Sequence, residues 1–201
     1  MIRWHVLLGL ALSLPLAAQA QDIDYGSIDG FYVPHASAHW PNSYAVDDDG
    51  NGAGFRVLSR ATDLVMVLAE YQYLSYGDPA VTTGQYRIGA GLALPSTTGV
   101  FLTYDHLDLH VENAIAFGLH GRIAGQVAGP LSLYGEAGYL GVDASSFYFD
   151  GVEFTFGASY DLPKPWGLFA DYRATLLDDR DATDELHREE WRVGVRFRFD
   201  C

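Results

Sequence analysis

The last regular pattern in the chain decides its fold: residues 191–199 read WRVGVRFRF. Bulky Trp191, Val193, Val195, Phe197 and Phe199 alternate with Arg192, Gly194, Arg196 and Arg198. A period of two is the signature of a β-strand whose two faces meet different surroundings. The bulky face carries aromatics at both ends, as does an earlier segment with Tyr32 and Trp40. That spacing is typical of the two interfacial girdles on a lipid-facing barrel wall, and the small, charged face suits a narrow polar interior.

The same period recurs in ten segments from residue 29 onward. The segments are 29–40, 53–61, 64–76, 82–94, 99–110, 113–128, 131–142, 150–162, 166–177 and 189–199. Each is near the ~9–11 residues that a tilted strand needs to cross a bilayer. Backbone groups cannot stay unpaired in hydrocarbon, so the sheet must close on itself. The sequence therefore predicts an all-β fold, a closed antiparallel transmembrane β-barrel of ten strands, or of eight if two segments are misassigned.

The connections between these segments are of two kinds. Five are long or acidic: 42–52, which contains Asp47, Asp48 and Asp49, then 77–81, 111–112, 143–149 and 178–188. Four are short turns: 62–63, 95–98, 129–130 and 163–165. Membrane barrels have long extracellular loops and short periplasmic turns. We therefore expect both chain ends to lie on the periplasmic side.

The first twenty residues have the pattern of a secretory signal peptide. Arg3 supplies a positive start, an apolar stretch runs from Val6 to Leu16, and small residues precede a cleavage site after Ala20. The alternative, an N-terminal membrane anchor, fits less well because the apolar run is too short. The expected organisation is a signal peptide over 1–20 and a barrel domain over 21–201.

Composition excludes several classes of function. The 201 residues contain 12 Lys+Arg against 26 Asp+Glu, and a net charge of −14 argues against nucleic acid as a partner. The one cysteine, Cys201, excludes an internal disulfide and a multi-cysteine metal site. The sequence contains no glycine-rich phosphate loop or dinucleotide fingerprint, so we expect no cofactor.

With these features, residues 25–199 resemble the small bacterial outer-membrane β-barrel proteins, in the company of the OmpA transmembrane domain, OmpX and OmpW. Gly194, Phe197 and Phe199 resemble that family's C-terminal assembly signal, although the family usually stops on the final aromatic and this chain adds Asp200 and Cys201. The resemblance implies export to the bacterial outer membrane. It also implies contact with outer-membrane lipid, lipopolysaccharide, periplasmic chaperones and the assembly machinery.

Arginine dominates the face expected to line the interior. The inward positions are Arg56, Arg60, Arg87, Arg122, Arg173, Arg192, Arg196 and Arg198. Counting from the turns predicts four cross-strand pairs with carboxylates: Arg56 with Glu70, Arg87 with Glu70, Arg122 with Glu136, and Arg196 with Asp171. Two interpretations remain open. The preferred one is a structural ion network that fills a narrow barrel, and the other is a charged constriction that selects solutes.

A hydroxyl nucleophile is one alternative source of chemistry. His35 and Ser37 lie two residues apart on the first segment, and a His beside a Ser can activate the hydroxyl. Some outer-membrane lipid-A deacylases resemble this arrangement. Parity, however, predicts that both side chains point inward, away from lipid, and the facing strand offers no obvious Glu. Polar lining of the interior is the preferred interpretation.

A metal site is the other alternative. His106, Asp108 and His110 occupy positions i, i+2 and i+4 of one segment, so their side chains share a face and could bind Zn²⁺. The preferred interpretation is a strand that leaves the membrane, where polar residues are expected. The acidic connections could bridge weakly through Ca²⁺ or Mg²⁺ to lipopolysaccharide, but a solvated surface explains them equally simply.

These observations favour a non-enzymatic integral outer-membrane protein that contributes to envelope integrity or to surface interaction through its acidic loops. The alternatives are a passive small-solute channel with an arginine-lined lumen and, with less support, a lipid-modifying hydrolase.

Overall fold

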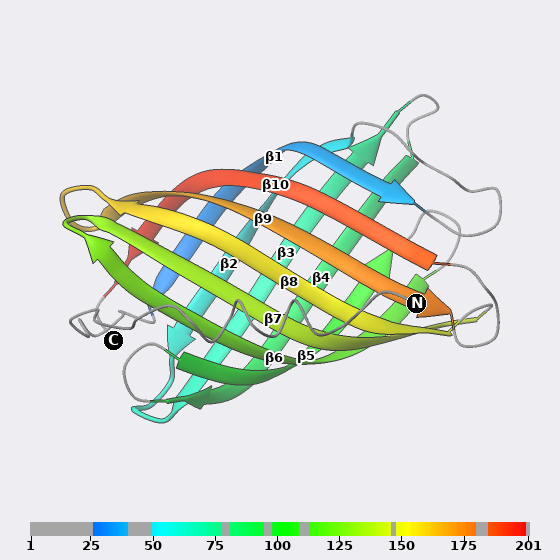
Figure 1. Cartoon of the computed structure of the whole chain (residues 1–201), viewed down its shortest axis with the longest axis horizontal. Coiled ribbons are helices and arrows are strands. Elements are labelled where there is room, and N and C mark those ends of the chain that lie inside the picture. The colour runs from blue at the N-terminus through cyan, green and yellow to red at the C-terminus, as the bar shows by residue number, and fades with distance from the viewer. Residues whose placement is uncertain are drawn as a thin grey trace.

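The computed structural model describes residues 26–39, 50–77, 81–94, 98–108, 113–145, 148–179 and 185–199. Its strands are β1 (Ser27–His39), β2 (Gly50–Arg60), β3 (Val65–Tyr76), β4 (Val81–Ala93), β5 (Thr98–Asp108), β6 (Asn113–Ala128), β7 (Leu131–Ala144), β8 (Tyr148–Asp161), β9 (Trp166–Asp179) and β10 (Glu185–Arg198). Each strand pairs antiparallel with its chain neighbours, and β1 pairs with β10, so the sheet closes into a barrel (Figure 1). The ten-strand prediction is confirmed, and the eight-strand alternative is wrong. Within the described ranges, no helix is long and apolar enough to cross a membrane.

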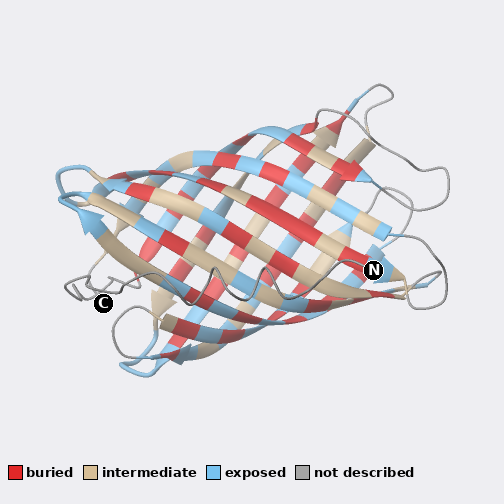
Figure 2. Cartoon of the chain, viewed as in Figure 1, coloured by how far each residue is buried: buried red, intermediate tan, exposed pale blue. Residues whose placement is uncertain are grey.

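Burial alternates along the strands, as Figure 2 shows by its red and pale blue bands. In β6, for example, every second residue from Ala114 to Arg122 is buried and those between are exposed. The exposed residues include large apolar side chains such as Leu102, which is 65% exposed, and Phe117, which is 61% exposed. The interior holds charged groups. Apolar outside and charged inside is the reverse of a soluble protein and is typical of a barrel surrounded by lipid.

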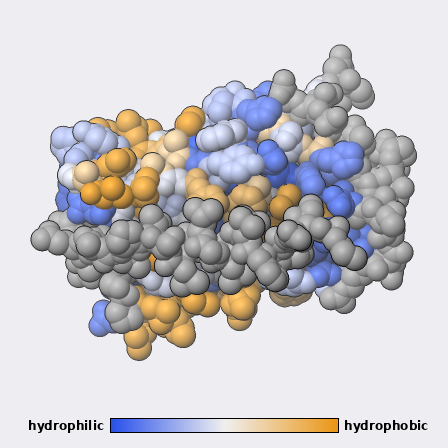
Figure 3. All heavy atoms as spheres, in the orientation of Figure 1, coloured by the Kyte–Doolittle hydropathy of each residue, from blue (hydrophilic) through white to orange (hydrophobic). Residues whose placement is uncertain are grey.

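The two ends of the barrel differ in their connections. At one end, left in Figure 1, tight turns such as 61–64 and 129–130 join the strands. Thr62 Oγ1 accepts a hydrogen bond from the Val65 N–H at 3.0 Å, and Gly129 has a φ of 51°, which favours glycine. We call this the turn end; β1 begins and β10 ends there. Figure 3 shows hydrophobic side chains gathered over this half of the barrel.

The opposite end, which we call the loop end, carries the connections 40–49, 77–80, 109–112, 145–147 and 180–184. Two of these are at least four residues shorter than the sequence predicts, because the flanking strands continue further. The connection 145–147 replaces the expected 143–149, and 180–184 replaces the expected 178–188. In particular, β10 begins at Glu185, four residues before the predicted start at 189.

Strand β1 is irregular beside Pro34. Its register with β10 shifts between Tyr32 and His35, so the strand contains a β-bulge. Before the bulge the odd-numbered Val33 is buried, and beyond it the even-numbered Ala36 is buried. Proline has no N–H to give to the ladder and is therefore accommodated at such bulges. Every side chain of β1 beyond Pro34 consequently changes face relative to an unbroken alternation.

Candidate functional site: the charged interior of the barrel

A row of charges of alternating sign crosses six neighbouring strands. Backbone register places Arg196, Asp29, Arg56, Glu70, Arg87 and Asp105 side by side on β10, β1, β2, β3, β4 and β5. All of them except Arg196 are buried. The predicted register of Glu70 with its two arginine neighbours is confirmed by the strand pairing. Each charge in the row has an opposite charge on the adjacent strand, which is a favourable cross-strand arrangement.

The ion pairs within this row are short at its two ends. Asp29 accepts a hydrogen bond from Arg196 Nε at 2.7 Å and another from Arg56 Nη2 at 2.8 Å. Arg87 Nε donates to Asp105 Oδ1 at 2.7 Å. These contacts join β10 to β1, β1 to β2, and β4 to β5. Asp29 therefore fastens the seam at which the first and last strands meet.

Glu70, at the centre of the row, instead reaches across the interior. Its Oε1 lies 2.7 Å from Arg173 Nη1 and 3.5 Å from Arg192 Nη1, on β9 and β10. The predicted ladder of neighbours is therefore right in register but incomplete in its contacts. A barrel this narrow brings opposite walls within reach of a long side chain. Arg87 spans the interior in the same way, with Nη1 2.6 Å from Glu153 Oε1 on β8.

Asp171 has a different partner from the one predicted. Arg192 Nε donates to Asp171 Oδ1 at 2.5 Å, and the two residues are register partners. The expected partner Arg196 binds Asp29 instead. The prediction failed because the β9–β10 connection is shorter than expected. The β10 residue that pairs with Asp171 is therefore Arg192, four positions before Arg196. The predicted pair of Arg122 with Glu136 is present in register, with Nη1 3.3 Å from Oε2.

Glu190 anchors a further group of charges. It is completely buried, Arg188 Nη2 lies 3.1 Å from its Oε2, and Arg173 Nη1 lies 3.5 Å from its Oε1. Gln72 donates a hydrogen bond to the same carboxylate. This group lies nearer the loop end than the Asp29 pairs. Ion pairs thus occupy the interior over much of its length.

Inward-facing charges balance across the described strands. The nine arginines are Arg56, Arg60, Arg87, Arg122, Arg173, Arg188, Arg192, Arg196 and Arg198. The nine carboxylates are Asp29, Glu70, Asp105, Glu136, Glu153, Asp161, Asp171, Asp179 and Glu190. All eight arginines predicted to face inward do so, and Arg188 joins them. The interior is lined by matched pairs and has no excess of positive charge.

Apolar side chains occupy the remaining space. One buried cluster consists of Phe31, Val33, Ala36, Ala38, Leu74, Tyr76 and Phe169. Two others are Ala114, Ala116, Leu140, Val142, Phe149 and Leu177, and Leu58, Met66, Leu68, Ala93 and Phe101. Between the charges lies a cavity of about 10 Å³, lined in part by Glu70, Arg87 and Arg173. A space of that size holds roughly one water molecule.

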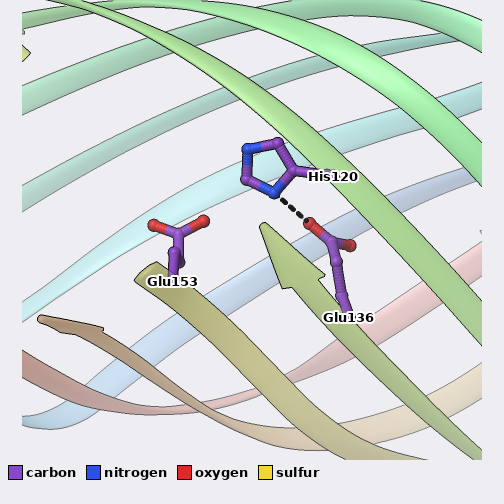
Figure 4. Close-up of side chains that lie close together, drawn as sticks. All are labelled: His120, Glu136 and Glu153. Carbon is purple, nitrogen blue, oxygen red and sulfur yellow. Dashed lines mark ion pairs between the residues drawn. The ribbon is translucent and has the colours of Figure 1, made fainter. Parts of the chain in front are cut away.

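His120, on β6, is the inward-facing imidazole of this interior. It is 1% exposed, and neither ring nitrogen has a hydrogen-bond partner. Figure 4 shows the ring pointing toward two carboxylates, Glu136 on β7 and Glu153 on β8. His120 Nδ1 lies 3.4 Å from Glu136 Oε1. One ligand atom from each of the three residues lies within 4.8 Å of the others, so the group could hold a metal ion.

The candidate nucleophile lies on the other face from the one predicted. The bulge at Pro34 turns His35 and Ser37 outward, where His35 is exposed and Ser37 is half-buried. The register also places Glu189 of β10 directly opposite Ser37, and Glu189 is exposed on the same outer face. Both sequence-based objections to this pair, its inward direction and its missing Glu, are therefore wrong.

The other sequence candidates lie on or beyond the outer face. His106 and Asp108 alternate with the buried positions of β5 and so face outward, next to Tyr86 and Gly84 of β4. His110, Trp40, the signal-peptide residues, Cys201 and the acidic Asp47, Asp48 and Asp49 are outside the described residues.

The residues of the assembly signal have clear places in the barrel. Gly194 faces the interior, where a Cβ would lie 2.3 Å from the Gly30 carbonyl and 2.6 Å from the Phe169 ring. Phe197 faces outward and packs edge-on against Trp166, with ring centroids 5.2 Å apart. The Phe199 N–H donates to the Gly26 carbonyl at 3.0 Å, which extends the seam to the turn end.

Sequence reasoning did not single out several interior groups: Asp29, Asp105, Glu153, Glu190 and His120. Three of them carried a usable signal. Asp105 lies opposite Arg87 if residues are counted back from the turn at 95–98, and His120 and Glu153 lie on faces that alternate with bulky residues. Their contacts across the interior, such as that of Glu153 with Arg87, have no signal in local spacing.

Comparisons with known proteins found one matching family model and several similar solved structures. The model of a family described as "Outer membrane protein beta-barrel domain" matches residues 6–199. Among solved structures, Neisserial surface protein A is 17% identical, with 86% of this chain and 96% of that chain covered and a TM-score of 0.48. The translocator domain of the autotransporter NalP from Neisseria meningitidis is 12% identical, with 90% and 91% covered and a TM-score of 0.49. A loop-deletion mutant of OmpT, an outer membrane protein of Vibrio cholerae, is 16% identical with a TM-score of 0.37. That match covers 80% of this chain and 57% of the OmpT chain. No curated protein sequence matches the chain.

Proposed function

The chain belongs to the outer-membrane protein β-barrel domain family and resides in the bacterial outer membrane, and from this premise we propose that it is a closed, non-enzymatic scaffold of the envelope. Its barrel stabilises the membrane in which it lies. Its acidic connections, 42–52 and 178–188 in the sequence, supply the surface for interaction outside the cell. Anionic loops suit partners that carry cations or that bind through divalent ions.

The observation that carries this proposal is the filled interior. Paired charges such as Arg87 with Asp105 and Glu153 cross the barrel, and apolar clusters occupy the space around them. A passive channel needs a continuous aqueous path, whereas the cavity among the ion pairs has room for roughly one water. Opening such a path would separate buried charges from their partners, which costs several kcal/mol for each pair.

Single-channel recording tests the closed interior. Residues 21–201 are refolded in detergent, folding is verified by the shift of the unboiled band on a gel, and the protein is inserted into planar bilayers. We expect no discrete conductance. A matched variant, Glu70→Ser with Arg173→Ser, removes one charge of each sign from the interior and reports whether the recording detects an opened barrel. Reproducible openings of the wild type would favour the small-solute channel instead.

Complementation tests the envelope function. In the source bacterium, loss of the gene is expected to increase the entry of a large antibiotic that an intact outer membrane excludes. Replacing Asp47, Asp48 and Asp49 together by Asn leaves the barrel unchanged. That variant should restore the permeability barrier but lose surface binding, because only the loop charge has changed. Unchanged permeability in the deletion strain would argue against a scaffold.

A second candidate, lipid-modifying hydrolysis, is favoured by one observation: His35 and Ser37 face outward, with Glu189 opposite Ser37. In this scheme the Ser37 hydroxyl attacks an ester carbonyl of lipid A while His35 accepts its proton. The C–O bond of the ester then breaks, and His35 returns the proton to the lipid A hydroxyl that leaves. Water hydrolyses the acyl-serine, which releases the fatty acid and restores Ser37. Ser37→Ala should abolish acyl release, while Ser159→Ala, at a buried interior serine, should not. Equal release by Ser37→Ala and wild type would exclude this chemistry.

A further inference from the structure

Three side chains from consecutive strands converge inside the barrel. His120 of β6, Glu136 of β7 and Glu153 of β8 each direct a ligand atom to one point, and these atoms lie within 4.8 Å of one another (Figure 4). One imidazole nitrogen and two carboxylate oxygens form a donor set that Zn²⁺ accepts. None of these three residues belongs to the motif His106, Asp108 and His110 in which the sequence suggested a metal.

The imidazole is held rigidly and is otherwise unused. The ring stacks on Phe101, with centroids 5.3 Å apart and planes 5° from parallel. A Cβ at Gly138 would lie 2.4 Å from His120 Nδ1, and one at Gly118 would lie 2.6 Å from Nε2. The two glycines thus leave the space that the ring fills. Buried polar atoms normally have hydrogen-bond partners, yet Nε2 of this ring has none in the described part of the chain, and Nδ1 has only the 3.4 Å contact with Glu136.

The two carboxylates are held from behind by other groups. Glu136 Oε2 faces Arg122 at 3.3 Å, which leaves Oε1 directed toward the imidazole. Thr175 Oγ1 donates to Glu153 Oε2 at 3.1 Å. Supporting contacts of this kind fix the direction of metal ligands in proteins.

Arg87 is the group that a cation would have to displace from Glu153. Its Nη1 donates to Glu153 Oε1 at 2.6 Å and its Nη2 to Oε2 at 3.2 Å, so Arg87 holds both oxygens of that carboxylate. Its Nε and Nη2 also donate to the two oxygens of Asp105, at 2.7 and 2.9 Å. Arg87 therefore keeps a two-point partner when Glu153 turns toward a cation.

We propose that His120, Glu136 and Glu153 bind one Zn²⁺ ion, which links β6, β7 and β8 inside the barrel. Zinc–ligand bonds of about 2.0–2.2 Å in tetrahedral geometry place ligand atoms about 3.4 Å apart. Atoms that lie within 4.8 Å here therefore approach one another by up to about 1.4 Å when the ion binds. Because the surrounding interior is filled, the ion enters while the barrel folds. Its function is structural, since three strands far from either chain end become joined by one ion.

Zinc content of the refolded barrel is the direct test. Residues 21–201 are stripped with a chelator while unfolded, refolded in detergent with Zn²⁺, freed of excess metal and analysed by atomic absorption. We expect about one zinc per chain in the wild type. His120→Gln, which keeps a polar side chain of similar size, should lose it. His187→Gln is the matched control because His187 lies outside the barrel, exposed beside Glu185, and should retain the zinc.

Several results would overturn the proposal. They are a folded wild type without zinc, zinc retained by folded His120→Gln, or zinc lost by His187→Gln. If His120→Gln does not fold, X-ray absorption at the zinc edge of the wild type replaces it: a single imidazole with oxygen ligands is expected, and a spectrum without imidazole contradicts the site.

Discussion

Removal of the Glu70 carboxylate is the sharpest test of the ion network. Glu70 is 4% exposed, and its partners Arg173 and Arg192 are also buried. Its register neighbours, Arg56 and Arg87, are arginines as well. Glu70→Ala therefore leaves four guanidinium groups around a position from which the negative charge has gone. The cavity beside this position has room for roughly one water molecule.

The expected loss follows from what each arginine retains. Removing one partner of a buried ion pair typically costs about 3–5 kcal/mol, because the remaining charge is left uncompensated. Here Arg192 keeps Asp171 at 2.5 Å, and Arg173 keeps Glu190 at 3.5 Å. We therefore expect a decrease of about 3 kcal/mol in the free energy of unfolding, at the lower end of that range.

Urea unfolding of the barrel in lipid vesicles, followed by the gel shift of unboiled samples, measures this loss. Glu185→Ala is the control, because that carboxylate is exposed at the loop end, and its effect should stay within about 0.5 kcal/mol. The double variant Glu70→Ala with Arg173→Ala should be more stable than the sum of the single variants predicts, since the two groups interact. If Glu70→Ala unfolds at the same urea concentration as Glu185→Ala, the network does not stabilise the barrel and our reasoning fails.

Two further predictions concern glycines at close approaches. Gly194→Ala places a Cβ 2.3 Å from a backbone carbonyl and should lower the yield of folded barrel on gels, whereas Gly30→Ala, with nothing within 4 Å, should leave the yield unchanged. Equal yields would show that the seam adjusts freely. Gly138→Ala places a Cβ 2.4 Å from His120 Nδ1 and should abolish zinc uptake, whereas Gly121→Ala, whose nearest atom is 4.0 Å away, should not. Zinc bound equally by both variants would contradict the position assigned to the ring.

Alternation in the sequence was enough to predict the barrel, its strand number and the face of most residues. In β10, for instance, parity alone places Arg192 and Arg196 inside and Trp191 outside. The turn-based counting also gave the register of Glu70 and of Glu136. Tight turns fix register because their length is set by backbone geometry.

Counting failed where a connection is not a tight turn or where a strand is interrupted. The length of the β9–β10 connection could not be predicted from the composition of that segment. Asp171 was therefore paired with Arg196 instead of Arg192. On β1, the bulge at Pro34 reversed the faces of His35 and Ser37. The proline within this segment indicated a possible bulge, because proline has no N–H to donate to the hydrogen bonds between strands. Contacts across the interior depend on how the sheet closes into a barrel. The spacing of residues within one strand carries no information about that closure.

Strand β10 also supplies much of the positive charge inside the barrel. It contributes four inward arginines, Arg188, Arg192, Arg196 and Arg198, and one inward carboxylate, Glu190. The other nine strands contribute five inward arginines against eight inward carboxylates. A chain without β10 would therefore have three more negative than positive charges in its interior, and Asp29 would lack its partner Arg196. Removal of β10 is therefore expected to destabilise the closed sheet, because it leaves buried carboxylates without their counter-charges.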